Sequence, residues 1–100
     1  MFKEIVKYEL NENIDEQHLL KISAKIIDVW MSKQPGFIRW DIHKDTDGIG
    51  YTDILYWKSQ EEAKAAEENM PSIPNAVEWF FCFKDGSIRV EGLELIGSFK

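Results

Sequence analysis

Two periods of hydrophobic residues divide the first third of the chain. Residues 2–10 alternate loosely between hydrophobic and charged side chains, which is typical of a strand. Residues 19–30 instead place hydrophobic side chains at helical spacing, and a capping box at 13–16 precedes them. A strand and a long helix are therefore predicted, and Pro35 ends the helix because the residue before a proline disfavours helical geometry.

The middle of the chain predicts a hairpin that leads into a second helix. Residues 37–44 and 51–57 have the β-branched and aromatic content of strands, and the Asp and Gly residues at 45–50 indicate a turn between them. The sequence Ser-Gln-Glu-Glu at 59–62 is a second capping box, followed by a run of Ala and Glu residues. The hairpin therefore runs directly into the second helix.

Prolines interrupt the last third of the chain. The second helix is expected to fade near Met70, because Pro71 and Pro74 break it. Pro74 suits the first turn of a short third helix, and an Asp-Gly turn then leads to a last strand over residues 87–96. Three hydrophobic residues of the third helix are expected to pack inward: Val77, Phe80 and Phe81.

The resulting order of elements, βαββ(α)αβ, defines the fold class. It is the order of a ferredoxin-like α+β domain, in which a four-stranded antiparallel sheet carries its helices on one face. A chain of 100 residues has room for one hydrophobic core. Residues 1–100 are therefore predicted to form a single domain.

Both faces of the predicted hairpin strands carry bulky side chains. In the strand at 51–57, Ile54 and Tyr56 lie on one face, whereas Leu55 and Trp57 lie on the other. The helices can cover only one face, and the chain has no further element to cover the second. A homodimer formed through the open sheet faces is therefore predicted, related by a two-fold axis.

Composition and charge exclude several classes of function. The net charge of −6, with no cluster of Lys or Arg, opposes binding to nucleic acid or to anionic lipid. No apolar run approaches the ~20 residues that span a bilayer, and the N-terminal residues do not form a signal peptide, so a cytoplasmic protein is expected. Cys82 is the only cysteine and the two histidines are far apart, so no metal site is expected.

Ionisable residues of the hairpin are the candidates for acid–base chemistry. Arg39, Asp41 and His43 share one strand face, and Asp53 shares a face with Trp57 on the neighbouring strand. If these groups are enclosed, shifted pKa values would allow His43 or Asp53 to act as a general base. In the alternative interpretation, the arginine and the aspartates only pair across strands and His43 is exposed at the hairpin end. Periodicity alone leaves open which sheet face meets the helices.

Thirteen aromatic residues are more than a small core usually needs, and they suggest a cavity or an interface. Tyr8, Trp40, Tyr56 and Trp79 are candidates to line a cavity for a flat aromatic ligand. The competing interpretation is that these side chains simply fill the core.

The hairpin and the helix that follows it carry a resemblance to a known family. Residues 35–63, which include Pro-Gly-Phe at the start of the hairpin and Trp-Lys-Ser-Gln-Glu-Glu-Ala at its end, are similar to the antibiotic biosynthesis monooxygenase family. The order of elements extends the resemblance over nearly the whole chain. It implies a dimeric α+β barrel, and it implies that Trp57 lines the substrate pocket between sheet and helices.

The same resemblance bears on cofactors. Haem-degrading members of the family have an Asn on the first strand and a His on the helix after the tryptophan. Here the strand reads Lys-Tyr-Glu-Leu at 7–10 and the helix reads Ala-Ala-Glu-Glu at 65–68, so both residues are missing. No bound haem or other cofactor is therefore expected.

These observations together give a functional hypothesis. The leading one is a cofactor-independent monooxygenase that acts on an aromatic or quinol-type small molecule. Its candidate catalytic residues are His43 and Asp53, and its candidate substrate-pocket residues are Trp57, Tyr8, Trp40 and Tyr56. The alternative is a non-catalytic, ligand-binding dimeric barrel, and an isomerase or decarboxylase is a third option.

Overall fold

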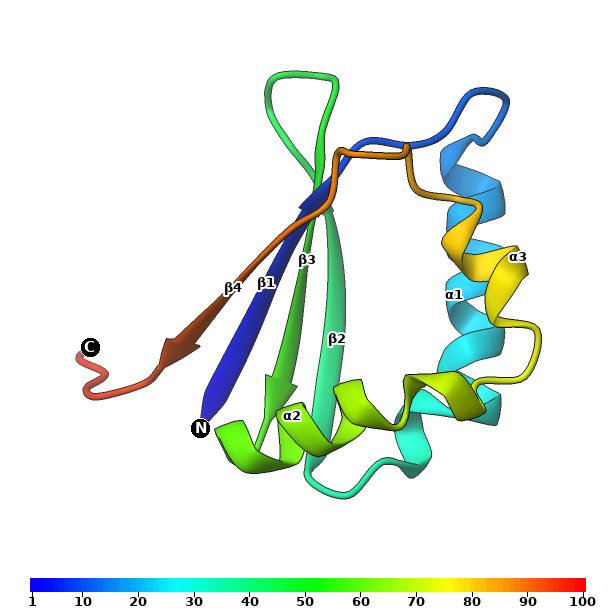
Figure 1. The fold of residues 1–100 in the computed structure, drawn as a ribbon. Helices are drawn as coiled ribbons and strands as arrows, with labels where there is room; N and C mark the ends of the chain where they lie inside the picture. The colour runs from blue at the N-terminus through cyan, green and yellow to red at the C-terminus, as the bar shows by residue number, and fades with distance from the viewer.

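A four-stranded antiparallel sheet carries all the helices on one face (Figure 1). The computed structural model describes residues 1–100. The order of elements confirms the predicted ferredoxin-like α+β fold. In chain order the elements are β1 (Phe2–Tyr8), α1 (Glu16–Val29), a 3₁₀ turn (Met31–Lys33), β2 (Phe37–Lys44), β3 (Tyr51–Trp57), α2 (Gln60–Glu68), a second 3₁₀ turn (Met70–Ser72), α3 (Ala76–Phe80) and β4 (Arg89–Glu94).

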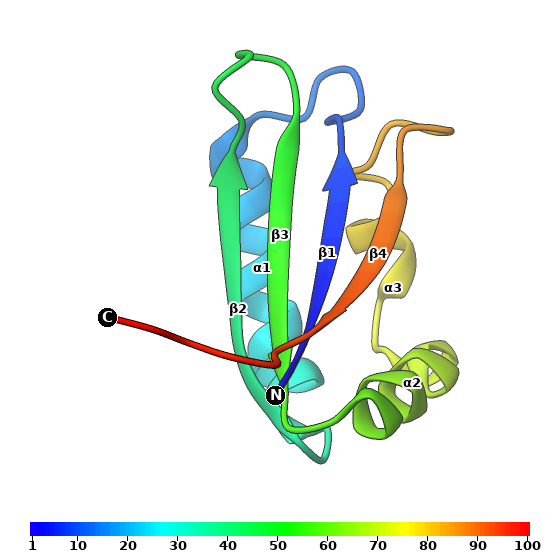
Figure 2. The ribbon, with the colours of Figure 1, turned by 90° about the vertical axis from the view of Figure 1, so that its left-hand side faces the viewer.

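The strands lie in the order β2-β3-β1-β4, so β1 and β3 form the centre of the sheet (Figure 2). Every neighbouring pair is antiparallel, and the register places Val6 opposite Asp53 and Tyr8 opposite Tyr51. The register between β2 and β3 shifts between Phe37 and Arg39. This irregularity lets both Phe37 and Trp40 turn toward the helices, which strict alternation would forbid.

The two main helices begin at side-chain caps. The Asp15 carboxylate accepts a hydrogen bond from the His18 backbone N–H at 2.8 Å, so α1 begins two residues later than a cap at Asn13 would place it. Asn13 instead has a positive φ of 65° in the preceding turn. In α2, the Ser59 hydroxyl accepts from the Glu62 N–H, which confirms the predicted cap, and it donates to the Glu62 carboxylate, which takes the place of the reciprocal backbone bond of a capping box.

The core lies between the sheet and the helices. Leu19, Ile22 and Ile26 of α1 are at most 3% exposed and pack with Trp57 in one hydrophobic cluster. The inward packing predicted for three residues of α3 is wrong, because Val77, Phe80 and Phe81 are 80%, 43% and 61% exposed. The helix begins at Ala76 and is only five residues long. Because it begins there, its inner side carries Trp79 and, one turn later, Cys82, and both are buried.

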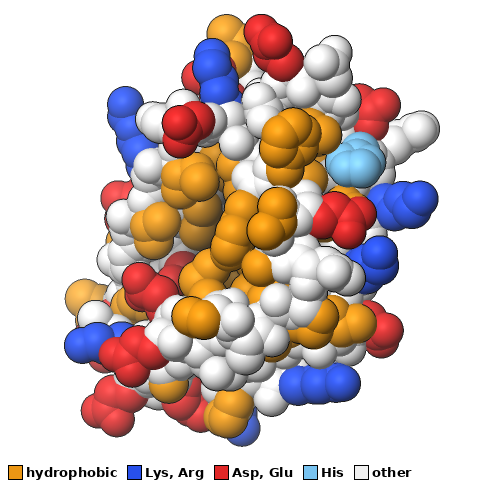
Figure 3. All heavy atoms as spheres, turned by 45° about the vertical axis from the view of Figure 1, so that its right-hand side comes forward, with side chains coloured by type: hydrophobic (Ala, Val, Ile, Leu, Met, Phe, Trp, Pro, Cys, Tyr) orange, Lys and Arg blue, Asp and Glu red, His pale blue; other side chains and the backbone are white.

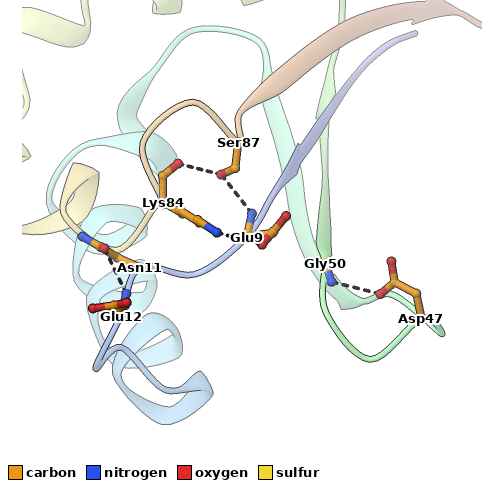
Figure 4. Close-up of polar contacts among 7 residues, drawn as sticks. All are labelled: Glu9, Asn11, Glu12, Asp47, Gly50, Lys84 and Ser87. Atoms are coloured by element: carbon orange, nitrogen blue, oxygen red, sulfur yellow. Dashed lines mark hydrogen bonds and ion pairs between the residues drawn. The ribbon is translucent and has the colours of Figure 1, made fainter.

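Short-range polar contacts fix the approach to β4 beside β1 (Figure 4). The Ser87 hydroxyl accepts from the Glu9 N–H at 3.1 Å and donates to the Lys84 carbonyl at 2.7 Å. Lys84 also forms an ion pair with the Glu9 carboxylate at 3.6 Å. These contacts position Ile88, the next residue along the chain, at the edge of the helix-covered side of the sheet.

The second face of the sheet has no helical cover, as Figure 2 shows. Beyond β4 the last residues extend away from the sheet, and Leu95, Ile96 and Phe99 are 46%, 98% and 96% exposed (Figure 1). None of the helices has both the length and the apolar character needed to cross a membrane.

We expect Ser59→Ala to lower the free energy of unfolding by about 0.5–2 kcal/mol, because it removes the hydroxyl that caps α2. Urea denaturation measures the loss. Lys64→Ala, on the exposed surface of the same helix, is the matched control and should change stability by less than the cap variant. Equal stability of both variants and the unchanged protein would contradict the assigned cap.

Candidate functional site

A cavity of about 250 Å³ lies between the sheet and the helices. Its floor is formed mainly by alternate residues of β1 and β3, with one residue each from β2 and β4, and its walls come from the residues just after α1, from α2 and from α3. Of its 17 lining residues 14 are hydrophobic, so a bound molecule would be largely apolar. Figure 3 shows hydrophobic side chains gathered in the middle of the helix-bearing side, with charged side chains around them.

Small residues of α2 leave the space open. Ala63 and Ala66 face the sheet, are buried, and line the cavity, whereas the residues across from them include Trp30 and Trp79. A larger side chain at either alanine would occupy the volume that these residues leave free. The Ala-rich composition of α2 thus determines the cavity as directly as the aromatic residues do.

Asp53 is the polar centre of the cavity floor. Its side chain is 3% exposed, and both carboxylate oxygens are held by donors from neighbouring strands. The Tyr8 hydroxyl donates to Oδ1 at 2.7 Å and the Trp40 indole N–H donates to Oδ2 at 3.0 Å. Burial raises the pKa of Asp53 to about 6, although the two hydrogen bonds and the charge of His43 oppose the rise. The group can therefore accept and release a proton near neutral pH.

Tyr8 stays protonated over the same range. Its pKa is raised well above the usual value, first by burial and then by the negative charge and the hydrogen bond of Asp53. The hydroxyl is thus a fixed donor to the carboxylate. Tyr8 also packs edge-on against Phe83, with ring centroids 4.7 Å apart, which holds the phenol in place.

Glu4 is a second carboxyl of the cavity floor. The Trp57 indole N–H donates to its Oε1 at 2.7 Å. Burial raises the pKa of Glu4, the Trp57 hydrogen bond opposes the rise, and the charge of Glu67 on α2 adds to it. Trp57 is 1% exposed and packs edge-on against Phe37, which fixes the indole that donates to Glu4. Trp57 itself is not among the residues that line the cavity.

The sheet separates the candidate residues identified from sequence into two groups. Tyr8, Trp40 and Asp53 meet in the cavity. His43 and Tyr56 lie on the uncovered face, because strand alternation places them opposite to Trp40 and Asp53. Helices cover the face that carries Asp53, which answers the question that periodicity left open.

On the uncovered face the side chains pair locally. Arg39 forms an ion pair with Asp41 at 3.1 Å and lies over the Tyr56 ring, 4.4 Å from its centroid. His43 Nδ1 lies 3.0 Å from the Thr52 carbonyl oxygen, and its side chain is exposed. The cross-strand pairing suggested for these residues is therefore wrong, because Arg39 and Asp41 pair within β2 and Asp53 takes no part.

Sequence reasoning did not identify Glu4 and Glu67. Glu4 lies two alternations from Tyr8 on the same face of β1, and a charged residue on the buried face of a strand is the signal that could have found it. Glu67 lies one turn beyond Ala63 on the inner side of α2, which a helical projection would have indicated. No three His, Cys, Asp or Glu side chains lie close enough together to hold a metal ion.

No protein-family model matches the sequence, and neither does any curated protein. Solved structures do match the fold. SnoaB, a cofactor-independent oxygenase from Streptomyces nogalater, has a TM-score of 0.74 and 13% identity over 97% of this chain and 94% of that one. A monooxygenase from the gene ActVA-Orf6 of Streptomyces coelicolor, solved with the ligand nanaomycin D, has a TM-score of 0.75 and 16% identity. The match covers 99% of this chain and 90% of that one.

A third similar structure is a candidate antibiotic biosynthesis monooxygenase from Bordetella bronchiseptica, with a TM-score of 0.74 and 14% identity over 95% of this chain and 96% of that one. The chain therefore has the fold of the antibiotic biosynthesis monooxygenases, as its hairpin and second helix predicted. At these identities the likeness concerns the fold, and the chemistry has to be argued from the cavity.

We expect the stability of the protein to fall relative to that of Asp53→Asn as the pH rises from about 4 to about 6. The folded pKa of Asp53 is raised to about 6 from 3.8, so the folded state holds the proton more tightly, and ionisation in this window destabilises it. The difference should reach about 3 kcal/mol at most, at about 1.4 kcal/mol per pH unit. Urea denaturation of both proteins across the window measures it, and parallel pH profiles would contradict the assignment.

Proposed function

We propose that this protein is a cofactor-independent oxygenase that acts on an aromatic, quinol-type small molecule bound in the cavity. The observation that carries the proposal is a buried carboxyl, Asp53, that is oriented by two donors in an apolar cavity and has a pKa of about 6. A base with a pKa near the operating pH is the main group that such chemistry needs from a protein. The fold that it shares with SnoaB, a cofactor-independent oxygenase, supports the proposal.

In the proposed reaction the substrate supplies all the electrons. Asp53 removes a proton from a hydroxyl group or an activated carbon of the substrate, and the resulting anion reduces dioxygen. For oxidation of a ring CH₂ group to a carbonyl, two C–H bonds break and one C=O bond forms. One oxygen atom of O₂ enters the product and the other leaves as water together with the two hydrogens. The apolar cavity keeps bulk water from the reactive anion.

Tyr8 and Trp40 are positioning residues in this scheme. Each donates to one oxygen of Asp53, so the lone pairs that remain free on the carboxylate keep a fixed direction. Trp57 has the corresponding role toward Glu4. His43 and Tyr56 lie on the other side of the sheet and have no part in the proposed proton transfer.

A second copy of the chain is the proposed cover of the open sheet face. That face carries both signs of charge, including Lys3, Arg39, Asp41 and Glu91, together with the half-exposed Leu93. A mixed pattern of this kind can complement itself across a two-fold axis. Leu95, Ile96 and Phe99, which follow β4, add exposed hydrophobic area that a second copy could cover.

We expect purified protein to consume oxygen with a panel of anthrone and naphthoquinol substrates, and Asp53→Asn to lower kcat by about 10²–10⁴-fold. For the unchanged protein kcat/KM should rise about tenfold per pH unit below about 6 and level off above it, because only the ionised carboxyl of Asp53 accepts a proton. Oxygen-electrode rates combined with product analysis measure both effects.

Two further variants make this test specific. Asp85→Asn makes the same chemical change in an exposed turn and should leave the rates unchanged. His43→Gln separates the two candidate bases, since loss of activity in this variant but not in Asp53→Asn would overturn the proposed role of Asp53. Binding of the panel without any oxygen uptake would overturn the oxygenase and favour a ligand-binding protein.

We expect light scattering to give twice the mass of a single chain. Leu93→Asp places a charge in the proposed interface and should shift the mass toward that of the monomer. Val77→Asp, at a more exposed hydrophobic position on α3, is the matched control and should remain dimeric. A monomeric mass for the unchanged protein would contradict the proposed dimer, whatever the activity.

A further inference from the structure

The charges around the cavity are all of one sign. Three carboxyl side chains line it, Glu4, Asp53 and Glu67, and no Lys, Arg or His is among the lining residues. Glu4 and Asp53 are on the floor, whereas Glu67 is an exposed residue of α2 at the rim. A molecule that enters this cavity therefore passes one carboxylate and comes to rest beside two others.

A second feature of the same cavity is an unpaired polar group in its wall. Trp79 lines the cavity and is 8% exposed, and its indole N–H is buried without a hydrogen-bond partner. An unpaired buried donor is unfavourable, so this part of the wall is less well satisfied than the rest of the core. Its neighbours Trp40, Phe80 and Phe83 hold the indole by ring contacts at centroid distances of 5.5–5.9 Å.

We propose that the cavity selects its substrate by charge: it takes a flat, neutral or cationic molecule with a hydroxyl or amino group, and it excludes the corresponding carboxylate. This inference rests on the proposed function, because it concerns the same cavity. For the oxygenase it means that the substrate enters in its protonated form and loses its proton only inside, to Asp53.

The exclusion has a simple electrostatic cause. In an apolar cavity the effective dielectric constant is low, so carboxylates repel an anion far more strongly than they would in water. An anion would also lose its hydration without gaining a cationic partner, since no lining residue supplies one. A neutral hydroxyl group, in contrast, carries no charge for the carboxylates to repel, and it can donate to a free lone pair of one of them.

The cavity size limits the skeleton. A volume of about 250 Å³ is just below the range of about 300–1,000 Å³ that is common for small-molecule sites. The aromatic lining favours flat rings. A two-ring compound is therefore a suitable probe, and three naphthalene derivatives that differ only in one group provide the comparison.

The experiment is calorimetric titration of the full chain with naphthylmethanol, naphthylmethylamine and naphthoate at mildly alkaline pH. Under this condition the carboxyls are ionised, the amine is protonated and naphthoate is an anion. We expect the alcohol and the amine to bind and naphthoate to bind at least tenfold more weakly than the alcohol. Naphthoate binding as tightly as the alcohol would overturn the charge selection.

Glu67→Gln tests the cause without disturbing the buried floor. We expect it to raise the affinity for naphthoate severalfold and to lower that for the amine, both relative to the affinity for the uncharged alcohol, which serves as the internal reference. Glu68→Gln is the matched control, because Glu68 is the exposed neighbour that does not line this cavity. Equal naphthoate affinities in the two variants would overturn the role of Glu67.

The outcomes separate this inference from the proposed function. If all three compounds bind equally well, charge selection is wrong while the cavity remains a small-molecule site. If none of them binds, the cavity is not a site for flat aromatic molecules, and the proposed function falls together with the charge selection.

Discussion

The buried carboxylate of Asp53 connects the three strands on which the cavity floor depends. Tyr8 of β1 and Trp40 of β2 each donate to one of its oxygens, so a single side chain of β3 ties its two neighbouring strands together on the helix-covered face. Removing this group from water is costly, and the cost shows in its raised pKa. The same contacts that compensate for part of that cost also orient the carboxylate toward the space under α2 and α3. Structure and proposed chemistry thus depend on one group.

The cavity under α2 and α3 depends on small side chains on one helix and on large aromatic side chains around it. Ala63 and Ala66 of α2 fill little of the space beside the sheet, and the large, rigid rings of Trp30 and Trp79 line the same cavity. The aromatic walls and the small side chains of α2 leave a cavity of about 250 Å³. Its few polar lining residues are all acidic. Fold likeness to oxygenases at 13–16% identity says nothing about such details, and the residues of this chain decide what the cavity accepts.

Much of the fold could be predicted from the sequence, because capping residues, prolines and periodicity act locally. Ser59 capped the helix it was expected to cap, and the four-stranded antiparallel sheet followed from the order of elements. The candidate site was only partly predictable. Alternation within each strand could not state that His43 and Asp53 lie on opposite faces, because this depends on the pairing register that the turn at 45–50 sets, in which Asp53 lies opposite Ile42. The inward side of α3 was missed for a similar reason, since the phase of a five-residue helix depends on its exact start.

The central claim is that Asp53 is a poised base inside a ligand cavity. The most direct test is an NMR titration of its carboxyl carbon, with and without naphthylmethanol. We expect a midpoint near pH 6 in the free protein and a changed midpoint when the ligand is bound. A midpoint close to the ordinary value of 3.8 that does not respond to the ligand would contradict the claim.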